Sequence, residues 1–251
     1  MRLLRRSFLG LAVAVSAALA FAPAQGGTVN AAVAANFTKV AVQLGADFKA
    51  ATGNDVVFSF GATGALYTQI TQAAPFDVFF SADDKRTATA IKDGFGVEGT
   101  DFTYAVGKVV LYSPTIDVTD GEAVLKANAF QHIAIADPKA APYGAAGMAV
   151  LDKLGLTDAV TPKIVTGENI TQTQQFVDSG SAELGFVALS QVIGKPATQT
   201  WLPPQEMYPA IKQNAVLLKV GETNDAAKAF LEYVKSEAAV KVIEAAGYSL
   251  Q

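Results

Sequence analysis

Two short segments of the chain combine residues that could bind an anion without a charged side chain. In the first, the apolar run 56–60 is followed by the small residues 61–64 and then by a stretch with helical spacing. The first N–H groups of a helix have no partner within it and carry partial positive charge, so Thr63 and its neighbouring N–H groups could hold an anion. Taken alone, the segment favours a simpler interpretation, in which Thr63 only caps the helix.

The second segment contains Asn36 and has the same order of elements. Residues 28–34 are typical of a short strand, and Val40, Leu44 and Phe48 have the spacing of one helix face. Asn36 lies where this helix begins, so it is a natural N-cap, and its turn could also present N–H groups to an anion. The cap is the favoured interpretation of this segment by itself.

Tyr143 and His132 are two further side chains that could do chemistry. Pro142 and Gly144 constrain the loop around Tyr143, and two roles are equally supported: packing in the core, or donating a hydroxyl hydrogen bond into a cleft. His132 is the only histidine and precedes the apolar run 133–136, which favours an exposed strand edge over a catalytic role. The sequence has no cysteine. Disulfides, thiol catalysis and cysteine-bound metals are therefore excluded, and a histidine cluster for zinc is excluded too.

Residues 1–24 resemble an export signal. Arg2, Arg5 and Arg6 precede an apolar run, and a small-residue cleavage site follows it. The pattern is similar to a twin-arginine signal, although the general secretory route stays open, and the apolar run is too short to favour a membrane anchor. We therefore expect the mature protein to begin near Gln25 and to reside in a bacterial periplasm.

The mature chain is acidic. The whole chain has 19 Lys and Arg against 23 Asp and Glu, a net charge of −4. Without the three arginines of the signal the balance becomes 16 against 23, a net charge of −7. Such a chain is a poor nucleic-acid binder and repels anions at long range. Any anion site therefore has to use short-range dipoles.

The order of the expected elements predicts two α/β halves. Residues 28–96 alternate strand and helix, which argues for a parallel sheet with crossover helices, and residues 133–190 repeat this order. The extended run 104–114 could carry the chain from one half to the other. A strand at 215–218 and a long helix at 225–245 complete the chain, and we expect the helix to cover a sheet.

Six segments resemble, in order, those of the periplasmic molybdate-binding proteins, which are substrate-binding components of bacterial ABC transporters. Each segment is weakly specific by itself, but together they span essentially the whole mature chain. They are residues 34–37 (Ala-Ala-Asn-Phe), 58–64 (Phe-Ser-Phe-Gly-Ala-Thr-Gly), 74–83 (Ala-Pro-Phe-Asp-Val-Phe-Phe-Ser-Ala-Asp), 133–138 with 142–144, 167–170 and 185–190.

The resemblance implies a type II periplasmic-binding-protein fold. In this fold two α/β lobes, each a mostly parallel sheet flanked by helices, clamp an oxyanion in the cleft between them. We place lobe 1 at residues 25–107 plus 215–251 and lobe 2 at 108–214. Crossing strands near Lys108 and Ala215 are the expected hinges for closure of the lobes.

The resemblance also implies an oxyanion site formed by Asn36, Thr63, Tyr143 and Ile170, the last through its main-chain N–H. Many members of the family carry a further tyrosine ligand at the position of Ala188. This chain departs from that pattern, and we expect the hydroxyl of Tyr143 to take the place of the missing phenol from another loop.

These assignments predict a binding protein, not an enzyme, with no catalytic residues and no cofactor. The assigned groups are neutral hydrogen-bond donors, which favour a fully deprotonated tetrahedral anion over one whose proton needs a carboxylate acceptor. The expected ligand is molybdate, and also tungstate, and the expected partner is an inner-membrane ABC permease. We expect a monomer that binds no nucleic acid. The alternatives are a receptor for another oxyanion such as sulfate, which cavity size would have to discriminate, and a secreted hydrolase that uses the same cleft.

Overall fold

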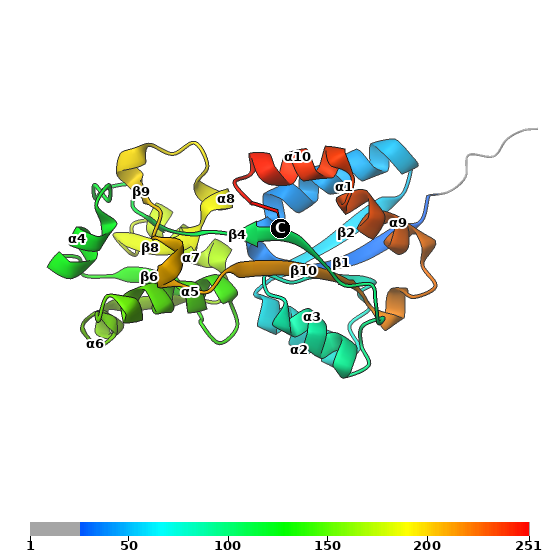
Figure 1. Cartoon of the computed structure of the whole chain (residues 1–251), viewed down its shortest axis with the longest axis horizontal. Helices are drawn as coiled ribbons and strands as arrows, with labels where there is room; N and C mark the ends of the chain where they lie inside the picture. Colours follow the sequence, from blue (N-terminus) through cyan, green and yellow to red (C-terminus); the bar gives the residue numbers. More distant parts are fainter. Residues whose placement is uncertain (1–25, 251) are drawn as a thin grey trace, which may run out of the picture.

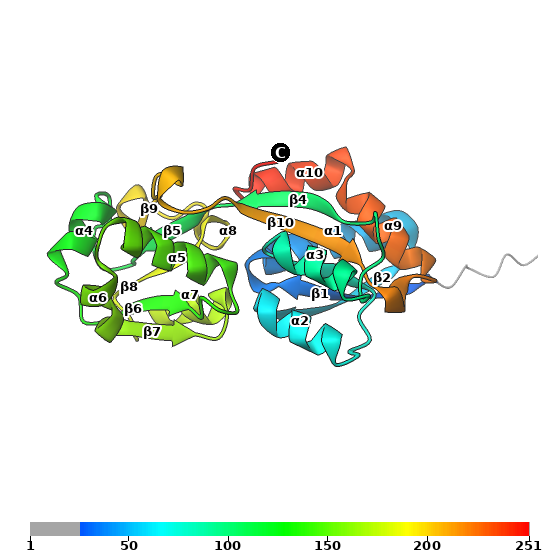
Figure 2. The ribbon, with the colours of Figure 1, turned by 60° about the horizontal axis from the view of Figure 1, so that its bottom comes forward.

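A computed structural model describes residues 26–250, and the export signal predicted at 1–24 lies outside them. Figure 1 shows two α/β lobes side by side, with strands running from one to the other. Each lobe has a five-stranded sheet with helices on its faces, as the second view shows (Figure 2). The predicted two-lobed α/β architecture is confirmed.

Lobe 1 is built on a sheet with the strand order β2-β1-β3-β10-β4. Strand β1 is parallel to β2 and β3, whereas β10 is antiparallel to both of its neighbours. The strands are β1 (Thr28–Ala34), β2 (Asp55–Gly61), β3 (Val78–Phe80), β4 (Phe102–Gly107) and β10 (Ile211–Leu217). The helices are η1 (Ala35–Phe37), α1 (Thr38–Thr52), α2 (Thr63–Thr71), α3 (Lys85–Lys92), η5 (Lys219–Gly221), α9 (Asp225–Val234) and α10 (Glu237–Ala245).

Lobe 2 is built on a second sheet with the order β7-β6-β8-β5-β9. Strand β6 is parallel to β7 and β8, and β5 is antiparallel to β8 and β9. The strands are β5 (Val109–Tyr112), β6 (Ile133–Ala136), β7 (Ile164–Gly167), β8 (Leu184–Ala188) and β9 (Thr200–Trp201). The helices are α4 (Gly121–Ala127), α5 (Pro142–Lys153), α6 (Thr157–Val160), η2 (Thr161–Lys163), α7 (Ile170–Asp178), α8 (Leu189–Val192), η3 (Ala197–Gln199) and η4 (Gln205–Met207).

The chain passes between the lobes at two places. The first is Lys108, between the end of β4 in one sheet and the start of β5 in the other. The return lies ahead of Ile211, because the whole of β10 pairs within the lobe 1 sheet and Ala215 pairs with Phe80 of β3. The predicted boundary between 214 and 215, and the hinge at Ala215, are therefore wrong. The first part of β10 contains polar residues, so the sequence pattern predicts only the buried apolar part of this strand.

Two predicted helices have different bounds in the structure. The long helix expected at 225–245 is divided into α9 and α10, and the Ser236 side chain accepts the Ala239 N–H at the start of α10. Helix α7 begins at Ile170, ahead of the predicted residue 174, because Asn169 caps it. In both places a capping side chain decides where the helix begins.

The core of lobe 1 anchors the start of the chain's first helical segment. Phe37 is 1% exposed and its ring lies 4.7 Å from that of Tyr104 and 5.5 Å from that of Tyr248. Aromatic pairs at such separations add to the free energy gained by burying the rings. Because Phe37 is held in this way, the position of its neighbour Asn36 is held too.

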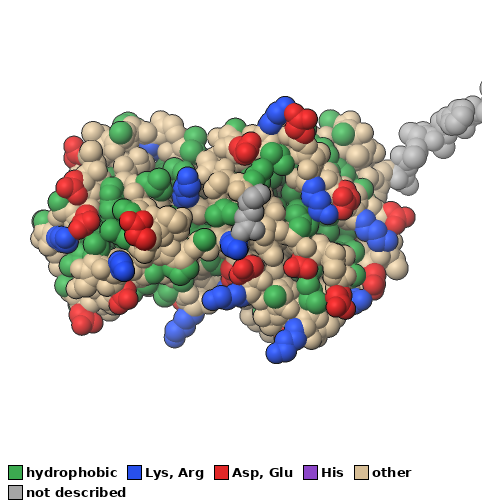
Figure 3. All heavy atoms as spheres, viewed as in Figure 1, with side chains coloured by type: hydrophobic (Ala, Val, Ile, Leu, Met, Phe, Trp, Pro, Cys, Tyr) green, Lys and Arg blue, Asp and Glu red, His purple; other side chains and the backbone are tan. Residues whose placement is uncertain are grey.

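The surface carries charges of both signs. Figure 3 shows Lys and Arg side chains interspersed with Asp and Glu over one face of the two lobes. His132 is exposed at the start of β6, where the sequence pattern predicts it. Within residues 26–250, none of the helices has both the length and the apolar character that crossing a membrane requires.

Candidate functional site

Four strand ends bring four helix starts together. In lobe 1, parallel β1 and β2 end in register at Ala34 and Gly61, directly before η1 and one residue before α2. In lobe 2, parallel β6 and β7 end in register at Ala136 and Gly167, ahead of α5 and α7. The carboxyl ends of parallel strands are the usual place for ligands in α/β sheets. The two lobes therefore direct two pairs of helix N-termini toward the cleft between them.

One small cavity lies where these helix starts meet, and its volume is about 10 Å³. The four predicted site residues all line it and are almost completely buried: Asn36 is 5% exposed, Thr63 1%, Tyr143 2% and Ile170 3%. The remaining lining residues are all uncharged as well, namely Ala34, Ala35, Gly61, Ala62, Ala82, Ala141 and Pro142. The structure thus brings the four residues together from both lobes around a neutral space.

Thr63 is the first residue of α2 and does not cap it. The N-cap position belongs to Ala62, which has no capping side chain, and Thr63 Oγ1 instead accepts the Ala82 N–H at 3.0 Å. The favoured interpretation of Thr63 as a helix cap is therefore wrong. Because its oxygen already accepts this bond from the start of the next segment, the hydroxyl proton of Thr63 is left to donate.

Asn36 is not an N-cap either. It lies in η1, and its Nδ2 donates to Gln213 Oε1 at 2.8 Å and to Tyr248 Oη at 2.9 Å. An amide group has two N–H donors, so both are used within the protein. The donor that Asn36 can offer the cavity is its backbone N–H, which the start of a helix leaves without a partner inside that helix.

Ile170 is the first residue of α7 and offers only its backbone. The capping side chain of Asn169 accepts the N–H groups of Thr171 and Gln172 at 2.9 and 3.1 Å. The N–H of Ile170 is not among these and lies at the buried N-terminus that lines the cavity. The cap therefore uses the next two donors of the helix and leaves the first one for a ligand.

Tyr143 follows Pro142 in the first turn of α5 and lies against lobe 1. Its Oη accepts a hydrogen bond of 3.1 Å from Gln213 Nε2, so the side chain is both buried and polar in its contacts. Burial raises the pKa of this phenol well above its usual value, with a smaller contribution from the nearby Tyr248, so the hydroxyl keeps its proton. Ala188, at the family position of a tyrosine, is buried at the end of β8 and brings no hydroxyl.

Three polar residues behind the cavity were not identified from the sequence. Gln213 is fully buried on β10, and Tyr104 and Tyr248 contact it or its partner Asn36 through their hydroxyl groups. The signal that could have found Gln213 is the pair of amide residues directly ahead of the apolar run 215–218. Buried amides in a strand need partners, so they mark a polar site in the core.

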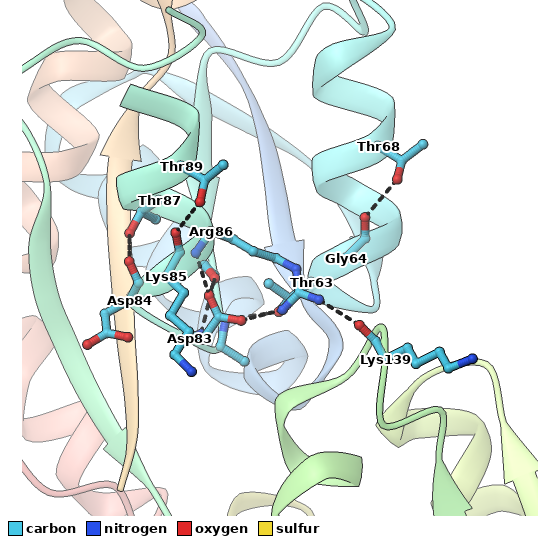
Figure 4. A network of polar contacts seen from close by, with 12 residues as sticks. Thr63, Gly64, Thr68, Asp83, Asp84, Lys85, Arg86, Thr87, Thr89 and Lys139 are labelled. Carbon is cyan, nitrogen blue, oxygen red and sulfur yellow. Dashed lines mark hydrogen bonds and ion pairs between the residues drawn. The ribbon is translucent and has the colours of Figure 1, made fainter. Parts of the chain in front are cut away.

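Hydrogen bonds across the cleft hold the two lobes against each other. The N–H of Gly64 donates to the carbonyl oxygen of Ala140 at 2.8 Å, and Arg86 Nη2 donates to that of Lys139 at 2.7 Å. Figure 4 shows the turn with Lys139 approaching the starts of α2 and α3, with Arg86 ion-paired to Asp83 between them. The turn of lobe 2 that precedes Tyr143 is thus fastened to lobe 1 at the rim of the cavity.

The Arg86 contact leads to a kinetic prediction. Replacing Arg86 by Gln is expected to raise the dissociation rate of a bound anion roughly 2–10-fold, because one hydrogen bond that joins the two lobes is weakened. Stopped-flow displacement would measure this rate. The matched control is Lys85→Gln, which removes the same charge from the adjacent position. An equal effect of the two substitutions would mean that charge, not the contact to Lys139, is responsible.

The chain matches known proteins along nearly its whole length. Residues 29–249 match the family model of a bacterial extracellular solute-binding protein. The chain is 50% identical over 246 residues to the molybdate-binding protein ModA of Rhodobacter capsulatus, covering 98% of this chain and 96% of the relative. A solved structure of the periplasmic molybdate-binding protein of Azotobacter vinelandii superposes with a TM-score of 0.85 at 41% identity, covering 89% of this chain and 99% of the other.

The same fold occurs in a protein that is much less similar in sequence. The sulfate-binding protein SubI of Mycobacterium tuberculosis superposes with a TM-score of 0.70 at 16% identity, over 88% of this chain and 86% of the other, which shows a shared fold alone. The close relatives are named for binding, and this confirms the prediction of a binding protein over a hydrolase. The chain therefore belongs to the bacterial extracellular solute-binding proteins and, within them, to the ModA molybdate-binding proteins.

Proposed function

We propose that this protein captures molybdate, and also tungstate, in the bacterial periplasm and delivers it to an inner-membrane ABC permease. The observation that carries the proposal is the neutral cavity that Asn36, Thr63, Tyr143 and Ile170 line from both lobes. The close relatives bear the name of molybdate-binding proteins, which supports the same ligand here. In this proposal the mature protein acts as a monomer after removal of residues 1–24.

The donors suit a tetrahedral dianion. The hydroxyl groups of Thr63 and Tyr143 and the backbone N–H groups at the starts of η1, α2, α5 and α7 can point at different oxygens of one anion. A hydrogen bond to a charged group contributes roughly 1.5–3 kcal/mol, so about seven of them would offset the desolvation of the dianion. No Asp or Glu lines the cavity, so a protonated anion finds no acceptor for its proton.

Titration calorimetry tests the ligand assignment. We expect molybdate and tungstate to bind tightly and sulfate, which is smaller, to bind more weakly because it cannot reach all the donors at once. Phosphate carrying a proton is expected to bind least. Equal or tighter binding of sulfate than of molybdate would overturn the assignment of the ligand and identify the protein as a sulfate receptor.

Binding is also expected to close the lobes. In this proposal the chain bends at the two crossings, near Lys108 and within 202–210, while the cross-lobe contacts of Gly64 and Arg86 form as the anion is enclosed. Small-angle X-ray scattering should therefore show a smaller radius of gyration with molybdate than without it. Identical scattering curves in the two conditions would contradict closure without affecting the ligand assignment.

A further inference from the structure

One buried amide, Gln213, joins the two lobes behind the cavity. Its Oε1 accepts from Asn36 Nδ2 at 2.8 Å and from Tyr104 Oη at 3.1 Å, and its Nε2 donates to Tyr143 Oη at 3.1 Å. Gln213 and Asn36 belong to lobe 1, whereas Tyr143 belongs to lobe 2. Gln213 does not line the cavity, so it can affect a ligand only through Asn36 or Tyr143.

The direction of each hydrogen bond follows from an atom that can only accept. The backbone oxygen of Asn36 lies 2.9 Å from Tyr248 Oη and 3.0 Å from Ser190 Oγ, and Tyr248 Oη lies 3.0 Å from Ser190 Oγ. A carbonyl oxygen has no proton to give, so the single proton of Tyr248 is used within this triangle. The Tyr248 oxygen must then accept from the Asn36 side chain, and the atom of Asn36 that faces it is Nδ2.

The hydrogen bonds of Gln213 fix the role of the Tyr143 hydroxyl in turn. Because Nδ2 of Asn36 also faces Gln213, the Gln213 atom on that side is the acceptor Oε1, and Nε2 faces Tyr143. The phenol oxygen of Tyr143 accepts this bond, so its proton cannot go to Gln213. Tyr248 Oη also lies close to this phenol and accepts from Asn36, but a hydroxyl oxygen has two lone pairs, so it can accept the Tyr143 proton as well while no ligand is bound. A bound anion is the stronger acceptor, because a hydrogen bond to a charged group is roughly twice as strong as one between neutral groups, so the phenol proton that is kept away from Gln213 goes to the anion.

The packing against the backbone of Gly107 fixes the position of the Tyr143 hydroxyl group. A Cβ atom on Gly107 would lie 2.0 Å from Tyr143 Oη and 2.6 Å from Gln213 Nε2. Only glycine at this position, the last residue of β4, lets the phenol and the amide lie so close to the backbone. The hydroxyl of Tyr143 is therefore held against β4 and β10, on a residue that also lines the cavity.

We propose that Gln213 is a positioning residue that holds the hydroxyl of Tyr143 as a hydrogen-bond donor to the bound oxyanion. The proposal rests on the function proposed above. Gln213 contributes nothing to the ligand directly, but it accepts from one lobe and donates to the other, so the phenol is aimed only when the lobes are closed. A preorganised donor binds more tightly than one that has to turn away from a protein partner first.

A double-mutant cycle tests this role, with molybdate as the ligand and calorimetry as the measurement. Tyr143→Phe is expected to weaken binding roughly 10–150-fold, the equivalent of one hydrogen bond to a charged group. Gln213→Met, which keeps the size of the side chain, is expected to weaken binding about 3–10-fold in the wild-type background. In the Tyr143→Phe background the same substitution is expected to change the affinity less than about 2-fold, because the proton that it positions is gone.

A neighbouring residue provides the matched control. Asn214 is a buried amide on the same strand, and its Oδ1 accepts from Thr103 Oγ1 at 2.8 Å, away from the site. Asn214→Met should lower the melting temperature as Gln213→Met does but leave molybdate affinity unchanged. If Gln213→Met folds poorly, Gln213→Glu is the second variant. Its carboxylate has no N–H to donate and accepts the proton of Tyr143 instead, so this substitution should weaken molybdate binding more in the wild-type background than in the Tyr143→Phe background.

The outcomes separate the two proposals. If the wild-type protein binds no molybdate, the proposed function is wrong. If it binds molybdate but substitution of Gln213 costs the same factor with and without the phenol, Gln213 has only a structural role and the inference is wrong. An unchanged affinity of Tyr143→Phe would also overturn the inference, since the phenol would then donate nothing to the anion.

Discussion

Replacing Thr63 by Val is expected to weaken molybdate binding roughly 10–150-fold. Valine has the shape of threonine, so the cavity keeps its volume, but the hydroxyl that can donate to the anion is lost. The magnitude corresponds to roughly 1.5–3 kcal/mol, the contribution of a hydrogen bond to a charged group in a buried site. Smaller effects are expected for exposed groups, and Thr63 is 1% exposed.

The substitution also affects the protein without ligand, and this effect can be measured separately. The Ala82 N–H, which donates to Thr63 Oγ1 at 3.0 Å, loses its partner in Thr63→Val, so the melting temperature should fall. That cost applies to the free and the bound protein and does not appear in the dissociation constant. Thr63→Ser keeps the hydroxyl and should bind molybdate within a few-fold of the wild type.

Thr68 supplies the matched control for Thr63. It lies on the same helix, and its Oγ1 donates to the Gly64 carbonyl at 3.0 Å on the exposed side, as Figure 4 shows. Thr68→Val removes a hydroxyl from α2 without touching the cavity and should leave the affinity unchanged. Equal losses in the two variants would mean that α2 is merely disturbed, and the assignment of Thr63 to the ligand would be wrong.

The comparison of Thr63 with Asn36 shows what the sequence can predict at this site. Strand, turn and helix are local patterns. The sequence therefore predicts correctly that Asn36 follows β1 and Thr63 follows β2, each at the start of a helix. Tyr143 and Ile170 are predicted to belong to the site because the chain resembles a known family. The partner of each side chain is decided by residues far along the chain, such as Gln213 for Asn36 and Ala82 for Thr63. Both predicted caps were wrong for this reason.

The return crossing between the lobes was misplaced for a related reason. Strand β10 begins with a polar stretch whose burial depends on pairing with β4, and Ile211 pairs with Gly107 in that strand. A period-two pattern is interrupted there by a shift in register between Gln213 and Asn214. The hydrophobic pattern therefore predicts only the last part of β10. The position of the hinge depends on where the first part begins, and the pattern does not predict that.

Replacing Gly144 by Ala is expected to affect both stability and binding strongly. A Cβ atom at this position would lie 2.0 Å from the carbonyl oxygen of Ala136 and 2.7 Å from its carbonyl carbon. These are backbone atoms at the end of β6 and cannot move aside as a flexible side chain can. The start of α5 would have to shift away from the sheet, and the N–H and hydroxyl groups of Tyr143 would shift with it.

We expect Gly144→Ala to lower the free energy of unfolding by roughly 1–3 kcal/mol, the usual cost of overpacking, and to weaken molybdate binding at least about 10-fold. Gly147→Ala is the matched control on the same helix, where a Cβ atom would lie 2.9 Å from the side chain of Phe186. This contact involves the Cβ of the buried Phe186 on β8 and therefore strains the packing, but Gly147 does not line the cavity. Gly147→Ala should therefore cost stability in thermal unfolding while molybdate still binds with an affinity close to that of the wild type. If both variants bind equally well, the close approach of α5 to β6 does not position the site, and the donors of Tyr143 are held by Gln213 and the cross-lobe contacts instead.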